Sequence, residues 1–184
     1  TLDVNMLHPQ KGQKVEVKVL SATGKSLFKQ IQSITSPADT LIHFEKLLKS
    51  VQPWSAESPY LYTLVINTTD RNGRVEESVA QPFGFRTIEM KNGQLLVNGV
   101  AITIKGVNRQ EHNAVHGRTL SIGEMVKDVK MMKLFNINAV RTSHYPNYSE
   151  WYQLCDKYGL YMVGEANIEC HGILDTEYKQ LADR

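Results

Sequence analysis

The sequence has few cysteines, little net charge and no long apolar run. Its 184 residues include two cysteines, Cys155 and Cys170, too few for a disulfide framework and without metal-ligand spacing. The formal net charge is +2 and the basic residues do not cluster, so we expect no nucleic-acid partner. No apolar stretch approaches the ~18 residues that span a bilayer, so we expect no membrane partner.

The first residues also lack the pattern of an export signal. Residues 1–5 contain neither a basic segment nor an apolar core of the signal-peptide type. We interpret both cysteines as reduced thiols, which favours a cytoplasmic protein. A periplasmic protein is the alternative, because a signal peptide ahead of Thr1 would reverse this expectation.

The first half of the chain has the pattern of short antiparallel strands. Val15, Val17 and Val19 alternate with polar residues, so one face of that segment is buried and the other is wet. Further short segments of this kind, separated by turn signals, occupy residues 26–31, 41–44, 60–66 and 75–85. This spacing is typical of a β-sandwich of immunoglobulin-like architecture, which we predict for residues 1–89.

The second half alternates strand and helix patterns. The hairpin signals Asn92-Gly93 and Asn98-Gly99 place the boundary near residues 89–94, and residues 90–184 form the second domain. The strands are predicted at 101–107, 137–140 and 160–163, and the helices at 125–135 and 149–157. Ser121 is placed to cap the first helix. The order β-α-β-α-β predicts a parallel sheet.

Chemically capable side chains follow two of these strands. They are Arg141, Ser143 and His144 after the second strand, and Glu165, Asn167, Glu169 and His171 after the third. Because the carboxyl ends of parallel strands meet at one edge, we expect a site there. Glu169 and His171 can face one pocket and are acceptable magnesium ligands, although their spacing alone is a weak signal. For His144 the structural alternative is a histidine satisfied within its own turn.

Several stretches of this half resemble glycoside hydrolase family 2. The run Asn138-Ala-Val-Arg141-Thr-Ser-His144-Tyr-Pro146, followed by Trp151-Tyr, Asp156 and Gly159-Leu-Tyr-Met-Val163, resembles the family signature. Residues 106–112 and 54–62 are similar to two further stretches of the family. Residues 167–172, Asn-Ile-Glu-Cys-His-Gly, resemble its β-galactosidase branch. The resemblance therefore extends over residues 54–172.

This resemblance implies a fold and a function. The fold is an immunoglobulin-like β-sandwich followed by the first βαβαβ portion of a (β/α)8 TIM barrel. The function is that of a fragment of a retaining β-galactosidase, which hydrolyses terminal non-reducing β-D-galactose residues of a β-galactoside substrate with magnesium in the active site. The parent enzyme is expected to be a homo-oligomer. The alternatives are a β-glucuronidase or β-mannosidase of the same family, and a non-catalytic carbohydrate-binding or interaction module.

The resemblance also implies residue roles. Glu169 and His171 match the positions that bind the active-site magnesium. His144 would contact the sugar in the transition state, and Arg141 would orient a carboxylate nucleophile, with a structural salt bridge as the alternative for Arg141. Gln110 stands where bacterial galactosidases carry a histidine that touches the sugar. Glutamine donates a hydrogen bond but cannot be cationic, so that contact differs here.

The catalytic carboxylates themselves are missing from the sequence. A retaining glycosidase uses two carboxylates about 5 Å apart. The resemblance implies two glutamates on later barrel strands, the first within an Asn-Glu pair, and no Asn-Glu pair occurs in the 184 residues. We therefore expect the full-length parent to be the enzyme and this chain alone to be inactive.

Overall fold

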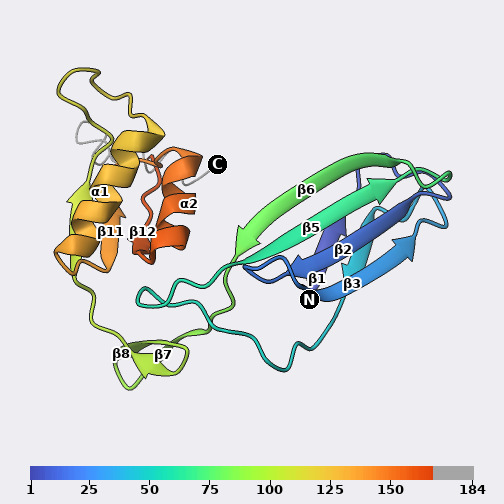
Figure 1. Ribbon diagram of the computed structural model, residues 1–184, viewed down its shortest axis with the longest axis horizontal. Coiled ribbons are helices and arrows are strands. Elements are labelled where there is room, and N and C mark those ends of the chain that lie inside the picture. The colour runs from blue at the N-terminus through green and yellow to red at the C-terminus, as the bar shows by residue number, and fades with distance from the viewer. Residues whose placement is uncertain (168–184) are drawn as a thin grey trace, which may run out of the picture. The chain divides into compact units, whose positions relative to one another are not determined.

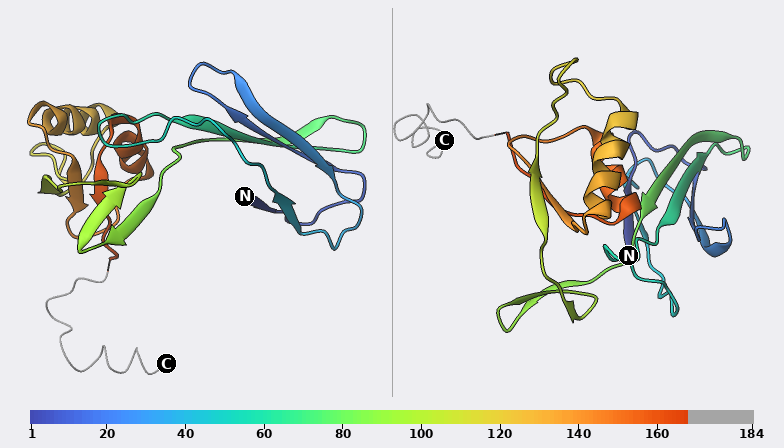
Figure 2. Two further views of the ribbon diagram at one scale, coloured as in Figure 1. Left: turned by 90° about the horizontal axis from the view of Figure 1, so that it is seen from below. Right: turned by 60° about the vertical axis from the view of Figure 1, so that its left-hand side comes forward.

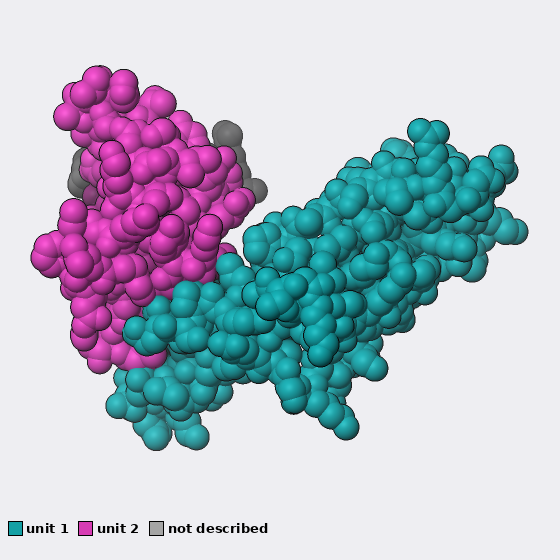
Figure 3. Space-filling model, viewed as in Figure 1, with its two compact units in different colours: residues 1–101 teal, residues 102–184 magenta. Residues whose placement is uncertain are grey.

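The computed structural model describes residues 1–167, and its contacts divide the chain into residues 1–101 and residues 102–184 (Figure 3). The first unit includes the small antiparallel sheet β7 (Ile88–Lys91), β8 (Gln94–Val97) and β9 (Val100–Ala101). The units therefore part after this sheet, whereas the boundary predicted from the sequence pattern, near residues 89–94, falls within it. Within residues 1–167, no helix combines the length and the apolar character needed to cross a membrane.

The first unit is built from two further antiparallel sheets, as Figures 1 and 2 show. The larger sheet has the order β3-β2-β5-β6, made of β3 (Ser26–Ser33), β2 (Lys14–Leu20), β5 (Tyr62–Thr69) and β6 (Val75–Phe83). The smaller sheet pairs β1 (Leu2–Asn5) with β4 (Leu41–Phe44). The buried core between them consists of Val15, Val17, Ile34, Ile42 and Phe44. The β-sandwich predicted from the strand pattern is confirmed.

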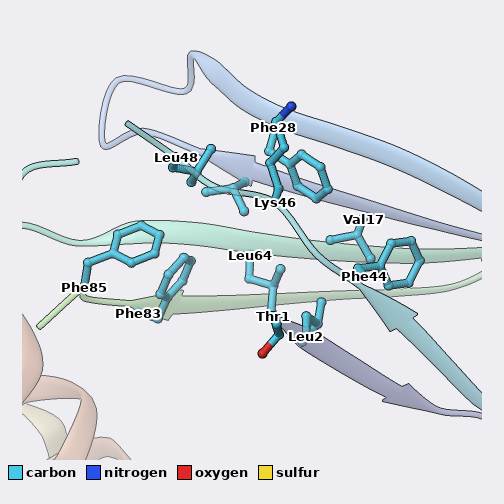
Figure 4. Close-up of a pocket in the computed structure, with 11 residues that line it drawn as sticks. Thr1, Leu2, Val17, Phe28, Phe44, Lys46, Leu48, Leu64, Phe83 and Phe85 are labelled. Atoms are coloured by element: carbon cyan, nitrogen blue, oxygen red, sulfur yellow. The ribbon is translucent and has the colours of Figure 1, made fainter. Parts of the chain in front are cut away.

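An apolar cavity of about 220 Å³ lies at one end of this core. Its lining includes Phe28, Phe44, Leu64, Phe83 and Phe85, whose side chains Figure 4 shows. Most of the lining is aliphatic or aromatic, Thr1 and Lys46 are its polar members, and no group of polar side chains converges on it. Because catalysis needs such polar groups, the cavity belongs to the interior of the sandwich and the candidate site lies in the second unit.

The second unit is a parallel sheet covered on one face by two helices. The sheet has the order β10-β11-β12, from β10 (Gly106–Arg109), β11 (Ala139–Thr142) and β12 (Tyr161–Val163). Val107, Val140 and Met162 are neighbours across the three strands and pack against buried residues of α1 (Ile122–Leu134) and α2 (Ser149–Tyr158). Both helices therefore cover the same face, and the predicted start of a (β/α)8 barrel is confirmed (Figure 1).

The first parallel strand is shorter and later than the sequence pattern indicates. The predicted strand at 101–107 is wrong in its bounds, since residues 102–105 are not in a strand and β10 begins at Gly106. The reason is pairing, because β11 offers partners only from Ala139 onward. Ahead of this ladder, the Asn138 side chain accepts a hydrogen bond from the Lys105 amide at 2.8 Å and donates one to the Thr103 carbonyl at 2.9 Å.

The helix ends follow from capping residues. The Ser121 side chain accepts from the Glu124 amide while the Glu124 carboxylate accepts from the Ser121 amide, so the predicted cap of α1 is confirmed. Helix α2 ends at Gly159, whose φ of 77° is the left-handed conformation that glycine adopts without strain.

Glu16 holds a small cluster of charges on β2. Its carboxylate lies 2.5 Å from Nζ of Lys18 and 2.7 Å from Nζ of Lys29, and Asn67 donates a further hydrogen bond. Hydrogen bonds from Lys18 first and then Lys29 lower the pKa of Glu16 from 4.5 to about 2. The folded state therefore binds this proton more weakly than the unfolded state does.

We expect Glu16→Gln to reduce the free energy of unfolding at pH 7 by about 1 kcal/mol, because the lysines are partly exposed and screened. The stabilisation from Glu16 is present above about pH 4.5 and is lost as the pH falls toward about 2, so the two proteins should converge there. Urea denaturation of both proteins between pH 2 and pH 7 measures the difference in the free energy of unfolding. Glu45→Gln, at an exposed carboxylate, is the control, and equal stability of wild type and Glu16→Gln at pH 7 would contradict the role.

Cys155 should be chemically inert in the folded chain. It lies in α2 with 1% of its surface exposed, which confirms the predicted place in a helix core. Burial first, and the nearby Asp156 charge second, raise the pKa of the thiol to about 12. Since the thiolate is the reactive form, iodoacetamide at pH 8 should modify Cys155 only after denaturation. Peptide-resolved mass spectrometry tests this, and rapid labelling of the native chain would refute it.

Candidate functional site

Three polar side chains meet beyond the carboxyl ends of β11 and β12. Arg141 lies in β11, His144 follows that strand, and Glu165 follows β12. Nη2 of Arg141 forms an ion pair with Oε1 of Glu165, and Nδ1 of His144 lies 3.0 Å from Oε2 of the same carboxylate. The same Nη2 lies 3.4 Å from Nδ1 of His144. Glu165 therefore joins Arg141 and His144 into one cluster.

The backbone of β11 sets the direction of these groups. Arg141 is paired with Asn108 of β10, and its Nη1 lies 3.5 Å from the Asn108 side-chain oxygen. These two positions alternate with Val107 and Val140, so they lie on the face of the sheet opposite the helices. In a (β/α)8 barrel this face is the interior. The peptide bond between Ser143 and His144 is cis.

The third strand is tied to the second beneath the cluster. The hydroxyl oxygen of Thr142, which is fully buried, accepts a hydrogen bond of 3.0 Å from the Glu165 amide. This bond fixes the start of the segment after β12 against the last residue of β11. The position of the Glu165 carboxylate thus depends on both strands.

The cluster is accessible and rich in hydrogen-bonding groups. The side chains of Arg141 and His144 are 40% and 38% exposed, and that of Glu165 is 19% exposed. A guanidinium and an imidazole can bind hydroxyl or carboxylate oxygens of a ligand. Both oxygens of Glu165 already have partners within the cluster, so this carboxylate is suited to holding its neighbours in place.

The other predicted site residues stand apart or lie outside the described region. Gln110 directly follows β10 and is exposed. Glu169 and His171, the predicted magnesium ligands, lie outside the described residues. Across residues 1–167, no three His, Cys, Asp or Glu side chains are grouped as metal ligands.

A second polar cluster, which the sequence patterns did not single out, lies on the helix side of the sheet. Arg109 is 6% exposed and its guanidinium stacks 3.7 Å from the ring centre of Trp151. Its Nη1 donates to Asn147 at 2.8 Å, and its Nε donates to Asp128 at 3.0 Å. The alternation along β10 could have indicated this, because Arg109 shares its face with the buried Val107. A charged residue there requires partners from the helices.

Sequence models of one enzyme family match nearly the whole chain. The model described as glycosyl hydrolases family 2, TIM barrel domain, matches residues 88–182. A second model, described as glycosyl hydrolases family 2, matches residues 1–86. The two matches meet just ahead of β7.

Curated relatives carry the name β-galactosidase. The chain is 54% identical over 126 residues to the β-galactosidase of Alteromonas mediterranea, an alignment that covers 68% of this chain and 12% of that protein. It is 56% identical over 119 residues to that of Halalkalibacterium halodurans, covering 65% of this chain and 12% of that protein. The chain thus spans about an eighth of the length of these relatives.

Solved structures of similar fold are β-glucuronidases. The Bifidobacterium dentium enzyme complexed with coumarin-3-O-glucuronide has a TM-score of 0.79 and 29% identity, covering 86% of this chain and 25% of that chain. The Ruminococcus gnavus enzyme in complex with D-glucuronic acid has a TM-score of 0.71 and 29% identity, covering 83% and 25%.

The hydrogen bond beneath the cluster can be tested by a pair of substitutions. Thr142→Val keeps the shape of the side chain but leaves the Glu165 amide without its acceptor, so we expect a loss of about 1–2 kcal/mol in the free energy of unfolding. Thr142→Ser keeps the hydroxyl and removes one methyl group, which isolates the packing contribution. Chemical denaturation of both variants measures the difference. If Thr142→Val is as stable as wild type, the bond does not hold the segment after β12.

Proposed function

The chain belongs to glycosyl hydrolase family 2, and from this we propose that its parent protein is a retaining β-galactosidase acting on terminal non-reducing β-D-galactose residues. The observation that carries the proposal is the identity of 54–56% with proteins named β-galactosidase. That identity exceeds the 29% shared with the β-glucuronidases of similar fold. The chain covers 12% of these relatives, so the activity is proposed for the parent.

The Arg141–His144–Glu165 cluster supplies sugar contacts in this proposal. His144 is held by Glu165 through Nδ1 and is 38% exposed, which suits an imidazole that hydrogen-bonds a substrate hydroxyl. Such a bond accelerates the reaction when it strengthens as positive charge develops on the sugar ring. Arg141 lies on the face that lines a barrel interior, where it would orient a carboxylate nucleophile contributed by the parent.

The nucleophile and the acid/base residue are assigned to the rest of the parent. Glu165 is the only described carboxylate in the cluster, and both of its oxygens are engaged by Arg141 and His144. The 184 residues contain no Asn-Glu pair. Glu165 is therefore a holding group, and the 184-residue chain alone is expected to lack turnover.

The proposal includes a magnesium ion that two residues would bind. Glu169 and His171 offer a carboxylate oxygen and an imidazole nitrogen, a donor set that suits a divalent cation. When bound, the ion would supply positive charge next to the reacting sugar. The residues of the described cluster act without it, by binding and orienting the substrate.

β-Glucuronidase is the second candidate, because the structures of similar fold carry that name. The two substrates differ in chemistry, since a glucuronide carries a carboxylate where a galactoside carries a neutral hydroxymethyl group. A glucuronidase therefore needs a cationic partner for that carboxylate, whereas a galactosidase does not. Comparing the rates on the two glycosides separates the candidates directly.

The test uses the protein encoded by the complete gene. We expect it to hydrolyse p-nitrophenyl β-D-galactoside far faster than the glucuronide or the mannoside, with retention at the anomeric carbon seen by NMR. Chelation by EDTA should lower the rate, and added magnesium should restore it. His144→Ala should lower kcat about 100-fold, as loss of a transition-state hydrogen bond does. His116→Ala, at an exposed histidine outside the cluster, should leave kcat unchanged.

Three results would contradict parts of the proposal. Faster hydrolysis of the glucuronide would favour the second candidate. Unchanged kcat in His144→Ala would remove His144 from the site even if the galactoside remains the preferred substrate. Turnover by the purified 184-residue chain would show that the catalytic carboxylates lie within it.

A further inference from the structure

The loop that carries His144 is short and fixed at both ends. It runs from Ser143 to Tyr148 and joins β11 to α2. At its start the Ser143 amide donates to the Arg109 carbonyl at 3.0 Å. At its end Tyr148 is the N-cap residue of α2, and its own side chain makes no capping hydrogen bond. The exposed amides of this helix end must therefore be satisfied by another group.

Glu111 provides that group from the segment after β10. Both of its carboxylate oxygens lie 3.2 Å from the Tyr148 amide, which donates to them. The negative charge also lies at the positive end of the α2 dipole, where an anion is favoured. Helix α1 is capped by its own Ser121 and Glu124, whereas α2 takes its cap from a different part of the chain.

Glu111 also holds the middle of the loop. Its backbone amide lies 3.0 Å from the Tyr145 hydroxyl, which accepts that hydrogen bond, and the same hydroxyl lies 3.4 Å from the Glu111 carbonyl. Tyr145 is the residue next to His144. The backbone and the side chain of Glu111 therefore fix the loop at positions one and four residues beyond the imidazole.

Arg109 compensates the buried charge of Glu111. The Glu111 side chain is only 6% exposed, and its Oε1 lies 3.5 Å from Nη1 of Arg109. The same Nη1 donates to Asn147, which belongs to the loop, at 2.8 Å. A buried carboxylate persists when it has such partners and costs several kcal/mol when it lacks them. The site side of the sheet and the helix side are thus connected through this loop.

We propose that Glu111 is a positioning residue for His144, which acts by holding the 143–148 loop and does not itself touch the substrate. The inference rests on the proposed function, because it assigns a consequence for glycoside hydrolysis. Catalytic contacts are sensitive to displacements of about 1 Å, so a loosened loop lowers kcat even when the imidazole is present. Substitution of a residue that only stabilises the fold should change kcat by the same factor whether or not His144 is present.

A double-mutant cycle in the complete protein distinguishes these roles. Glu111→Gln keeps the size of the side chain but removes the charge, and we expect it to lower kcat about tenfold on p-nitrophenyl β-D-galactoside with little change in KM. In the His144→Ala background the same substitution should change kcat by less than about twofold, because the group being positioned is already gone.

Glu124→Gln is the matched control for a general loss of stability. It removes the corresponding capping carboxylate from α1, whose hydrogen-bond partners Ser121 and Asn113 lie outside the 143–148 loop. It should lower the thermal midpoint and leave kcat unchanged in both backgrounds. Tyr145→Phe removes only the hydroxyl that binds the Glu111 backbone, and it provides a milder variant in case Glu111→Gln fails to fold. It should show the same dependence on His144 with a smaller loss of kcat.

The outcomes separate this inference from the proposed function. Equal losses of kcat with and without His144, for Glu111→Gln or for Tyr145→Phe, would overturn the positioning role and leave the proposed function intact. A complete protein that hydrolyses the glucuronide and not the galactoside would overturn the proposed function, and the same cycle would then be measured on the glucuronide. Non-additive losses of kcat on the glucuronide would support the positioning role independently of the proposed function.

Discussion

The parallel pairing of β10 with β11 determines where each functional side chain of the second unit lies. Side chains alternate along a strand, so the register that places Val107 beside Val140 also places Asn108 beside Arg141 on the other face. A slip of β11 by one residue would turn Arg141 toward the helices, and a slip of β10 by one residue would turn Arg109 away from them. The accessible Arg141–His144–Glu165 cluster and the buried Arg109–Glu111 cluster are thus two results of one register.

The sequence predicts the parts of the fold that depend on local pattern. Alternation at Val15, Val17 and Val19, the Ser121 cap and the position of Cys155 in a helix core are all properties of a few neighbouring residues, and the structure confirms them. Strand β1 was missed because its alternation covers only four residues and its identity comes from pairing with β4. The start of β10 was misplaced for the same reason, since β11 limits it.

The candidate site also has a part that the sequence predicts and a part that depends on long-range contacts. Gathering of polar residues beyond parallel strands follows from topology, so Arg141 and His144 could be foreseen as neighbours. Their joint partner Glu165 could not, because its contact depends on where the segment after β12 turns, and a single hydrogen bond to Thr142 fixes that turn. The cap of α2 could not be predicted from local sequence either, because the N-cap residue Tyr148 makes no capping hydrogen bond with its own side chain. Both features depend on hydrogen bonds between residues far apart in the sequence.

The central place of β2 in the sandwich has a consequence for how that unit folds. β2 pairs on one side with β3, which follows it after a short turn, and on the other with β5, which lies more than forty residues further along the chain. Closing a long loop costs entropy before its contacts form, so local hairpins assemble before distant strands. The β2–β3 and β5–β6 hairpins are therefore expected to form as separate early pieces, and the slow step is the meeting of β2 with β5.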